Sequence, residues 1–429
     1  MLDLKFIREN SDKVKENIKK KFQDSKLKKV DELLKYDEEN RKLMQESQKL
    51  RQKRNLVNQE INKLKKSGKD IKKKLAEAKK IPEKLKQIES KQEEVGNKIC
   101  EILKIIPQII HDSVPIGKND GENVEREIIG KIKKFSFPVK SHVEIAENLN
   151  MADFDISACT SGNGFYFLKG DLALLQMAVI NFARDFMVKK GYLYVEPPLM
   201  IRKKVVDGVM SFDEMDNMMY KIEGEDLYMI GTSEHPLIGA FIDKVLDEKD
   251  LPIKITGYSM CFRKEIGSHG IDEKGFYRTH QFNKQEMVVL CKPEDSYKYY
   301  NEMLDITKAI FKKLVLPTRV LECCSGDLAD LKSKSCDLEA WSPRKEEYFE
   351  VASLTNMEDA QARRLNIKAT TGKDKYLVHT LNNTVVATSR VLVAILENFQ
   401  NKDGSVTVPK VLHPYMMGKT ILKSKKKEW

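Results

Sequence analysis

The sequence has few features of a secreted or membrane-spanning protein. Its seven cysteines form no C-x-x-C pair, so a disulfide framework is not indicated, and Cys323, Cys324 and Cys336 lack the matching histidines of a zinc site. No run of about 18 apolar residues occurs, and charged residues stand at the N-terminus where a signal peptide would need an apolar segment. We therefore expect a cytoplasmic protein with reduced thiols and no membrane contact.

The usual phosphate-binding loops are also missing. Neither a Walker A segment nor Gly-x-Gly-x-x-Gly follows any predicted strand. If a nucleotide binds, arginines must hold its phosphates, because one guanidinium group can donate to two phosphate oxygens at once. Arg263 and Arg390 are the candidates, although either one alone could be an ordinary surface arginine.

Positive charge is concentrated at one end of the chain. The 429 residues, 41% of them hydrophobic, suffice for two or three domains and carry a net charge of +11. Residues 1–110 alone hold 31 Lys and Arg against 19 Asp and Glu, so the remainder is nearly neutral. A basic block of this kind is either a solvated helix face or a surface for a polyanion.

The basic region predicts an antiparallel two-helix coiled coil. Residues 26–66 contain no proline or glycine, and apolar side chains recur there every seven residues. A turn is expected at 67–70, followed by a second helix with a kink or a restart near Pro82. A forty-residue helix would extend roughly 60 Å. The apolar seam consists of Tyr36, Leu43, Leu50, Val57 and Leu64 on the first helix and Ile81, Ile88, Val95 and Ile102 on the second.

Basic side chains concentrate toward the tip of this hairpin. No aromatic residues alternate with them, which favours recognition of a nucleic-acid backbone over base stacking. The alternative is a hairpin that serves only as a spacer or as a dimerisation element. The candidates for phosphate contacts are Arg51, Arg54, Lys63, Lys65, Lys66, Lys69, Lys72 and Lys73.

A domain boundary is expected near residue 112. Prolines and glycines become frequent after Ile110, so we assign residues 1–112 to the hairpin domain and residues 113–429 to a second domain. The second domain mixes predicted helices with short strands joined by turns, which favours a mostly antiparallel sheet flanked by helices. The predicted fold class is therefore α+β.

Three ordered segments resemble the motifs of class II aminoacyl-tRNA synthetases. A predicted helix at 171–190 leads into GYLYVEPPLM, which resembles motif 1 and contains Pro198. The tetrapeptide FRKE at 262–265 resembles motif 2, and LNNTVVATSRVLVAILENFQ, with Arg390, resembles motif 3. The resemblance implies the antiparallel catalytic sheet of that class and a homodimer with Pro198 at its interface.

Further segments narrow the resemblance to seryl-tRNA synthetases. They are GTSEHPL, HQFNKQE, EAWSPRKEEYFEVASLTN and ARRLNIK. The basic hairpin resembles the tRNA-binding arm of that family, so the likeness covers essentially the whole chain, with residues 1–112 as the tRNA-binding domain and 113–429 as the catalytic domain. The pattern before Arg390, with Asn383, Val386 and Ser389, is similar to the archaeal and eukaryotic type. The zinc-dependent type is not indicated.

The resemblance implies a role for each residue of a nucleotide site. Arg263 would contact the α-phosphate of ATP and the carboxylate of serine, and Arg390 would hold the γ-phosphate. Glu265 would bind the adenine amino group, and Phe282 would stack on the base. Glu350 and Ser353 would bind the ribose–phosphate region of ATP and a Mg²⁺ ion. The other implied ATP contacts are Lys264, Thr279, Val351 and Ala352.

For the amino acid, the resemblance implies a site that receives the ammonium and hydroxyl groups of L-serine. The residues implied are Thr232, Ser233, Glu234, Arg263, Glu286, Asn382 and Thr384. The implied activity is that of a serine–tRNA ligase, which activates serine with ATP and passes it to tRNA(Ser), and to tRNA(Sec) where that tRNA is present. The hairpin would grip the long variable arm of the tRNA.

Two other interpretations remain open at this point. A catalytically silent relative could bind tRNA or a protein through the hairpin, although it would have no need to retain Arg263, Glu265, Glu286, Glu350 and Arg390 together. A class II ligase for another amino acid would share the ATP site and differ in the amino-acid pocket. Pyrophosphate exchange that depends on serine distinguishes both from a serine–tRNA ligase.

Overall fold

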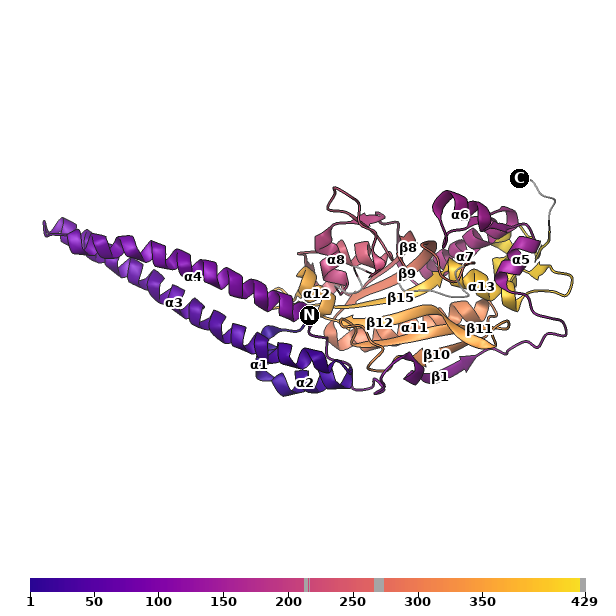
Figure 1. Cartoon of the computed structure of the whole chain (residues 1–429), viewed down its shortest axis with the longest axis horizontal. Coiled ribbons are helices and arrows are strands. Elements are labelled where there is room, and N and C mark those ends of the chain that lie inside the picture. The colour runs from indigo at the N-terminus through magenta and orange to yellow at the C-terminus, as the bar shows by residue number, and fades with distance from the viewer. Residues whose placement is uncertain (212–214, 216, 266–273, 425–429) are drawn as a thin grey trace. The chain divides into compact units, whose positions relative to one another are not determined.

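The chain forms two compact units, Met1–Ile109 and Ile110–Trp429, in a computed structural model that describes residues 1–211, 215, 217–265 and 274–424. Each unit is described by itself. In the first unit, Figure 1 shows two long helices lying side by side as a hairpin, which confirms the predicted arm. The helices of this unit are α1 (Leu4–Glu9), α2 (Ser11–Lys20), α3 (Leu27–Lys66) and α4 (Lys72–Ile105).

The predicted apolar seam holds the hairpin together. Leu43 and Val57 of α3 and Ile81, Val95 and Ile102 of α4 are buried between the two helices. Burial of each such side chain contributes about 1.5–3 kcal/mol. The base of the hairpin is closed by α1 and α2, which place Ile7, Val14 and Ile18 in one cluster with Val30, Leu33 and Leu103. The seven-residue period therefore predicted the correct faces.

A kink or a restart was expected at Pro82. The restart is wrong, because α4 runs without interruption from Lys72 to Ile105, and the kink stays a prediction. Proline removes one helical hydrogen bond and costs about 3 kcal/mol in a helix interior. Its neighbours Ile81 and Leu85 are buried against Val57 of the opposite helix. Packing across the hairpin thus keeps the helix continuous at a residue that, judged locally, should end it.

The second unit is built on a mostly antiparallel sheet, as predicted. Within the described residues the main sheet has eight strands, and each neighbouring pair is antiparallel except β4 with β8. In spatial order its strands are β1 (Val124–Ile129), β10 (Thr318–Glu322), β11 (Lys334–Ser342), β12 (Glu347–Glu358), β15 (His379–Ala387), β9 (Gln281–Cys291), β8 (Ile253–Phe262) and β4 (Leu193–Val195).

Helices and small sheets surround this main sheet. The helices are α5 (His142–Asn148), α6 (Asp155–Ser161), α7 (Gly170–Lys189), α8 (Lys203–Val209), α10 (Glu234–Gly239), α11 (Ser296–Lys313), α12 (Ala360–Leu365) and α13 (Thr388–Asn398). The short strands are β2 (Ala152–Asp153), β3 (Phe167–Leu168), β5 (Met200–Ile201), β6 (Tyr228–Met229), β7 (Val245–Asp247), β13 (Lys368–Thr370), β14 (Lys375–Leu377), β16 (Val406–Thr407) and β17 (Ile421–Leu422). None of the helices in the described ranges has the length and apolar character that a membrane span requires.

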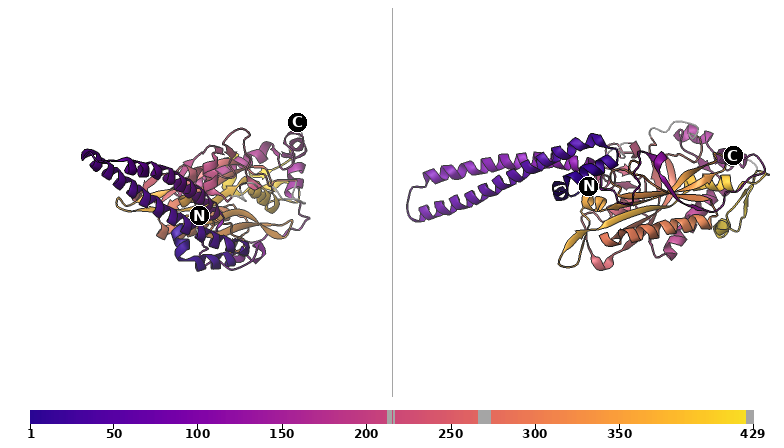
Figure 2. Two further views of the ribbon diagram at one scale, coloured as in Figure 1. Left: turned by 60° about the vertical axis from the view of Figure 1, so that its left-hand side comes forward. Right: turned by 90° about the horizontal axis from the view of Figure 1, so that it is seen from below.

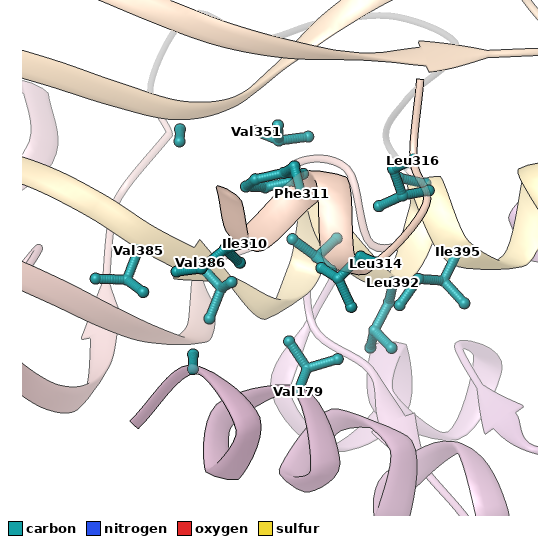
Figure 3. Close-up of a cluster of buried hydrophobic side chains, with 14 of the residues drawn as sticks. Val179, Ile310, Phe311, Leu314, Leu316, Val351, Val385, Val386, Leu392 and Ile395 are labelled. Atoms are coloured by element: carbon teal, nitrogen blue, oxygen red, sulfur yellow. The ribbon is translucent and has the colours of Figure 1, made fainter. Parts of the chain in front are cut away.

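The main core lies between the sheet and helices α7, α11 and α13. In Figure 3, Ile310 and Leu314 of α11 lie close to Val386 of β15 and to Leu392 of α13. Nearly every residue of α13 is buried, so this helix is fixed along its length. Because Arg390 lies in the first turn of α13, the position of its backbone follows from this apolar packing.

The two faces of the sheet have different surroundings along β15. The Asn383 amide points to α11, where it donates to Thr307 Oγ1 at 2.8 Å and to the Met303 carbonyl at 3.1 Å. Figure 2 shows α11 lying along the sheet. Side chains alternate along a strand, so Asn382 and Thr384 point to the opposite face. The face turned away from α11 is the one that carries the candidate site.

Candidate active site

A cavity of about 370 Å³ lies in the second unit, on the sheet face that Asn382 and Thr384 present. This volume is typical of a small-molecule site. The structure therefore brings together residues that the sequence separates widely. The predicted site residues that line the cavity are Thr232, Glu234, Arg263, Glu265, Thr279, Phe282, Glu350, Val351, Ser353, Asn382, Thr384 and Arg390.

Other predicted residues do not line the cavity within the described part of the chain. Ser233 and Ala352 are buried, and Glu286 contacts two lining residues, Thr232 and Lys284, without lining the cavity itself. Pro198 is exposed elsewhere on the unit, and Lys264 flanks Arg263 without lining the space. The polar middle of the motif 2 segment, residues 266–273, lies outside the described residues. The residues that line the cavity therefore include only part of the set predicted for the site.

Two buried acidic residues contact the hydroxyl group of Thr232. Thr232 Oγ1 donates to Glu286 Oε2 at 3.1 Å and accepts from the Glu234 amide at 3.3 Å. Glu234 Oε1 accepts from Asn382 Nδ2 at 3.0 Å and from Gln361 Nε2 at 2.8 Å. Burial, followed by the nearby charge of Glu286, raises the pKa of Glu234 to about 7. The arrangement is a polar recess in which side-chain amides hold the Glu234 carboxyl group and the Thr232 hydroxyl group donates to Glu286.

Lys284 is a residue of this recess that the sequence analysis did not single out. Its ammonium group forms an ion pair with Glu286 and lies 3.4 Å from Thr232 Oγ1. Alternation along β9 places Phe282, Lys284 and Glu286 on one face of the strand. That alternation within HQFNKQE was the signal that could have identified Lys284.

Arg263 is held at the edge of the cavity where β8 ends. Its Nε donates to the Gly231 carbonyl at 3.2 Å, and its guanidinium group lies 5.3 Å from the centre of the Phe282 ring. Arg278 Nη1 forms an ion pair with Glu265 Oε2 at 3.5 Å. Glu265 itself has a φ of 49°, a left-handed conformation that is costly for a side chain of this type. Strain at this position is consistent with a functional role.

Arg390 and Glu350 form the second charged cluster. Arg390 Nη1 donates to the Glu350 carbonyl at 3.0 Å and pairs with Glu350 Oε2 at 2.9 Å, while the guanidinium lies 5.4 Å from the Tyr277 ring centre. Burial raises the pKa of Glu350, but the Arg390 guanidinium together with the charges of Arg263 and Lys332 lowers it, and the net shift is downward. Glu350 therefore stays ionised, with one of its carboxylate oxygens paired to Arg390.

Asp337 is a second cavity residue that the sequence analysis missed. It lies on β11 opposite Ser353 of β12 and lines the cavity with it. Burial, followed by the charge of Glu350, raises the pKa of Asp337 to about 7. In KSCDLEAW, Asp337 stands between the buried apolar positions 336 and 338, and this alternation could have drawn attention to it. The alternation alone does not show which face of the strand meets a ligand.

The tip of the hairpin carries the predicted basic residues, and most of them are unpaired. Gly68 has a φ of 67°, which glycine tolerates best, and the Lys69 amide closes the turn by donating to the Leu64 carbonyl at 3.0 Å. Arg51 is paired with Glu89 of α4 at 2.9 Å. Across the described chain no carboxylate lies within 4 Å of the remaining exposed candidates, which are Arg54, Lys63, Lys65, Lys66, Lys69, Lys72 and Lys73.

The chain is similar to known proteins along most of its length. Residues 1–110 match the seryl-tRNA synthetase N-terminal domain, and residues 219–399 match the class II core domain of tRNA synthetases (G, H, P, S and T). The chain is 47% identical over 328 residues to the serine–tRNA ligase of Methanospirillum hungatei, which covers 76% of this chain and 77% of that relative.

Solved structures give the same likeness. Seryl-tRNA synthetase from Pyrococcus horikoshii complexed with ATP matches with a TM-score of 0.95 and 40% identity, covering 99% of this chain and all of that one. The cytoplasmic serine–tRNA ligase of Naegleria fowleri in complex with AMP matches with a TM-score of 0.89 and 33% identity, covering 99% of each chain. The similarity therefore extends over the hairpin and the cavity-bearing unit alike.

Proposed function

Because this chain belongs to the seryl-tRNA synthetase family, we propose that its cavity joins L-serine to ATP and that its helical hairpin binds the tRNA. The activity is that of a serine–tRNA ligase, which releases diphosphate in the first step and AMP in the second. One observation carries this function: a single cavity gathers Arg263 and Arg390 beside Glu234 and Asn382. Nothing in the comparisons supports a catalytically silent relative.

The arginines and the aromatic ring form the ATP site. Arg263 would hold the α-phosphate and Arg390 the γ-phosphate, in keeping with the absence of a glycine-rich phosphate loop from the sequence. Phe282 offers its ring to the adenine, and Glu265 offers acceptors to the adenine amino group. Two related structures contain ATP and AMP, which supports nucleotide binding. Thr279 adds a buried hydroxyl group whose oxygen has no protein partner in the described structure.

Glu350 and Ser353 are the proposed ligands of Mg²⁺. Both residues lie on the same face of β12, because the register shift between Leu338 and Glu339 sets Glu350 opposite Glu339 and Ser353 opposite Asp337. Their carboxylate and hydroxyl oxygens line the cavity and suit a hard cation that also binds phosphate oxygens. When bound, Mg²⁺ supplies positive charge at the phosphates. No cluster of three or more His, Cys, Asp and Glu side chains suited to a metal occurs among the described residues, and zinc has no part in the proposal.

Thr232, Glu234, Glu286, Asn382 and Thr384 form the proposed serine site. The Glu234 carboxyl group suits the ammonium group of serine, and the surrounding hydroxyl and amide groups suit its side-chain oxygen. Glu286, which pairs with Lys284, accepts from Thr232 and so orients that hydroxyl group. A site built around a hydroxyl group leaves its own polar groups unpaired when alanine enters. Discrimination of about 10⁴ to 10⁵ has been reached by sites of this kind. Threonine must be excluded by size.

The chemistry requires positioning more than proton transfer. The serine carboxylate is already a nucleophile, and its oxygen attacks the α-phosphorus while the bond to the β-phosphate oxygen breaks and diphosphate leaves. Arg263 is placed to neutralise the charge of both reacting groups. In the second step a ribose hydroxyl of the terminal tRNA nucleotide attacks the seryl carbonyl, loses its proton, and AMP leaves.

Serine-dependent exchange of labelled diphosphate into ATP tests this proposal. We expect exchange with L-serine, and a decrease of about 10⁴-fold or more in kcat/KM when alanine replaces it. Circular dichroism establishes that the protein is folded. Folded protein without exchange would contradict the proposed activity, and exchange with a different amino acid would show a ligase of another specificity.

The raised pKa of Glu234 predicts that serine binding depends on pH. Above pH 7 the carboxyl group is ionised and can accept from the ammonium of serine, whereas below pH 7 it is protonated. We expect kcat/KM for serine to fall as the pH decreases from 8 to 6, by at most about tenfold per pH unit. Exchange is measured at limiting serine and saturating ATP. The Glu234→Gln variant should lose this dependence, and an unchanged profile in that variant would assign it to another group.

A homodimer is proposed from the motif 1 surface. The apolar side chains of Leu174, Met177 and Val188 on α7 and of Leu193 on β4 are 37–65% exposed. These two elements contact each other and lead to the exposed Pro198. A second copy on this surface would remove the side chains from water, as the resemblance to motif 1 implies.

The hairpin is the proposed tRNA-binding element, and residues 1–112 are the proposed tRNA-binding domain beside a catalytic domain at 113–429. Unpaired lysines and arginines near its tip suit contacts with phosphates. The proposed partners are tRNA(Ser) and, where it is present, tRNA(Sec). Because aminoacylation takes place where these tRNAs and serine occur, we place the enzyme in the cytoplasm.

A further inference from the structure

A buried hydrogen-bond network behind the cavity joins three distant segments. His142, the first residue of α5, directs Nδ1 to Glu397 Oε1 of α13 at 3.2 Å, and its backbone amide donates to the same oxygen at 3.3 Å. The Phe276 amide donates to His142 Nε2 at 3.3 Å. The three side chains are at most 5% exposed. Gly275 allows this close approach, because a Cβ atom there would lie 2.4 Å from His142 Nε2.

The hydrogen-bond partners of His142 indicate which ring nitrogen carries the proton. A ring nitrogen that accepts from an amide carries no proton, so His142 Nε2 presents its lone pair to Phe276 and Nδ1 carries the hydrogen that points to Glu397. Two further side chains hold the Glu397 carboxylate in place. Ser342 Oγ donates to Glu397 Oε2 at 2.6 Å, and Arg344 Nε lies 4.0 Å from Oε1. His142 is therefore a fixed link between α13 and the chain at Phe276.

The residues that follow Phe276 reach the ATP site. Tyr277 and Arg278 both line the cavity. The Tyr277 ring supports the Arg390 guanidinium at 5.4 Å, and Arg278 pairs with Glu265 at 3.5 Å. A displacement of the Phe276 backbone would move both neighbours, and with them the two residues proposed for the γ-phosphate and the adenine.

We propose that His142 is a positioning residue for ATP binding. Its Nε2 acceptor fixes the backbone of Phe276, and this sets the positions of Tyr277 and Arg278 against Arg390 and Glu265. His142 itself touches neither substrate, since it does not line the cavity within the described residues. The inference rests on the proposed function of the cavity and extends it to a residue outside the class II motifs.

Two substitutions of His142 test whether the acceptor at Nε2 is what matters for ATP binding. Glutamine can place its amide oxygen near the position of Nε2, so His142→Gln keeps an acceptor for the Phe276 amide. Asparagine reaches only the position of Nδ1, so His142→Asn keeps the donor to Glu397 and loses that acceptor. In pyrophosphate exchange we expect KM for ATP to rise about tenfold in His142→Asn and less than about twofold in His142→Gln. KM for serine should remain within about twofold in both.

His413→Gln is the control, because His413 is a half-buried histidine whose Nε2 bonds to the Val408 carbonyl at 2.9 Å and which does not line the described cavity. It should leave KM for ATP unchanged. Equal KM values for the two His142 variants, or a loss of kcat alone, would overturn the positioning role. A wild-type protein without exchange would instead overturn the proposed function.

A second measurement does not depend on the folding of a variant. In wild-type protein labelled with ¹⁵N only at phenylalanine, the Phe276 amide should exchange slowly with solvent because it donates to a buried acceptor. Addition of ATP should leave this protection in place, since the network is already formed in the free protein. Rapid exchange of the Phe276 amide would overturn the proposal.

Discussion

Replacing Arg263 by alanine abolishes serine activation. The Arg263 guanidinium is proposed to neutralise the α-phosphate and the serine carboxylate at the same time, and nothing else in the described cavity wall is proposed for both tasks. We expect serine-dependent exchange to decrease by at least about 10³-fold, which corresponds to about 4 kcal/mol of lost transition-state stabilisation. Arg263→Lys should recover only part of the activity, because an ammonium group lacks the two-pronged donor geometry.

Arg319→Ala is a matched control for this loss. Arg319 also lies over an aromatic ring, with its guanidinium 4.8 Å from the Tyr348 ring centre, and it pairs with Glu339 at 2.6 Å. It does not line the cavity described above. The substitution removes the contacts of Arg319 with Tyr348 and Glu339 and should therefore lower the melting temperature by a few degrees. Serine-dependent pyrophosphate exchange should be unchanged. Near-normal exchange in Arg263→Ala would show that the motif 2 assignment is wrong.

Removing the hairpin abolishes tRNA charging and spares serine activation. The change replaces about residues 35–101 by a short glycine linker. Lys98 lies 5.5 Å from the Tyr36 ring centre, so the two cut ends are close together. The base cluster keeps Ile7, Val14 and Ile18 of the short helices with Val30 and Leu33. Pyrophosphate exchange should therefore stay within about twofold, since the second unit has its own core and is untouched.

Charging of tRNA(Ser) by the shortened protein should fall below detection, because the hairpin is proposed to supply the phosphate contacts that dominate affinity for nucleic acids. A full-length variant with the unpaired tip lysines changed to glutamine tests whether the positive charge of the hairpin, and not only its length, is needed for charging of tRNA. Its KM for tRNA should rise strongly, and the dependence of that KM on salt should become shallower. The lysines concerned are Lys63, Lys65, Lys66, Lys69, Lys72 and Lys73. Normal charging by the shortened protein would show that the hairpin is only a spacer.

Several features of the fold could be predicted because local rules determine them. The seven-residue repeat from Tyr36 to Leu64 specifies one buried stripe on a long helix, and the second repeat specifies its partner. A turn between them leaves an antiparallel hairpin as the simplest arrangement. Pro82 shows the limit of such rules, since the local cost of a proline is smaller than the gain from packing Ile81 and Leu85 against the other helix.

The candidate site could be predicted only as a set of residues. The motif segments identify Arg263, Glu265 and Arg390 by their resemblance to a family, but no local pattern shows that Lys284 pairs with Glu286 or that Gln361 orients Glu234. Alternation along a strand divides its side chains between two faces. Which face meets a ligand depends on where α11 packs, and that is a matter of contacts between distant segments.

The sequence by itself determined the two-helix arm, its excess of positive charge, the α+β class and most of the charged residues that are proposed for the chemistry. Only the tertiary structure decided how these residues act together. The register of β12, β15 and β9 places Glu286 opposite Thr384 and Asn382 opposite Thr355. Burial in that arrangement, with a second carboxyl group nearby, raises the pKa of Glu234 to about 7. Desolvation and charge coupling depend on residues that are far apart in the chain, so a pKa shift of this kind cannot be predicted from a local sequence pattern.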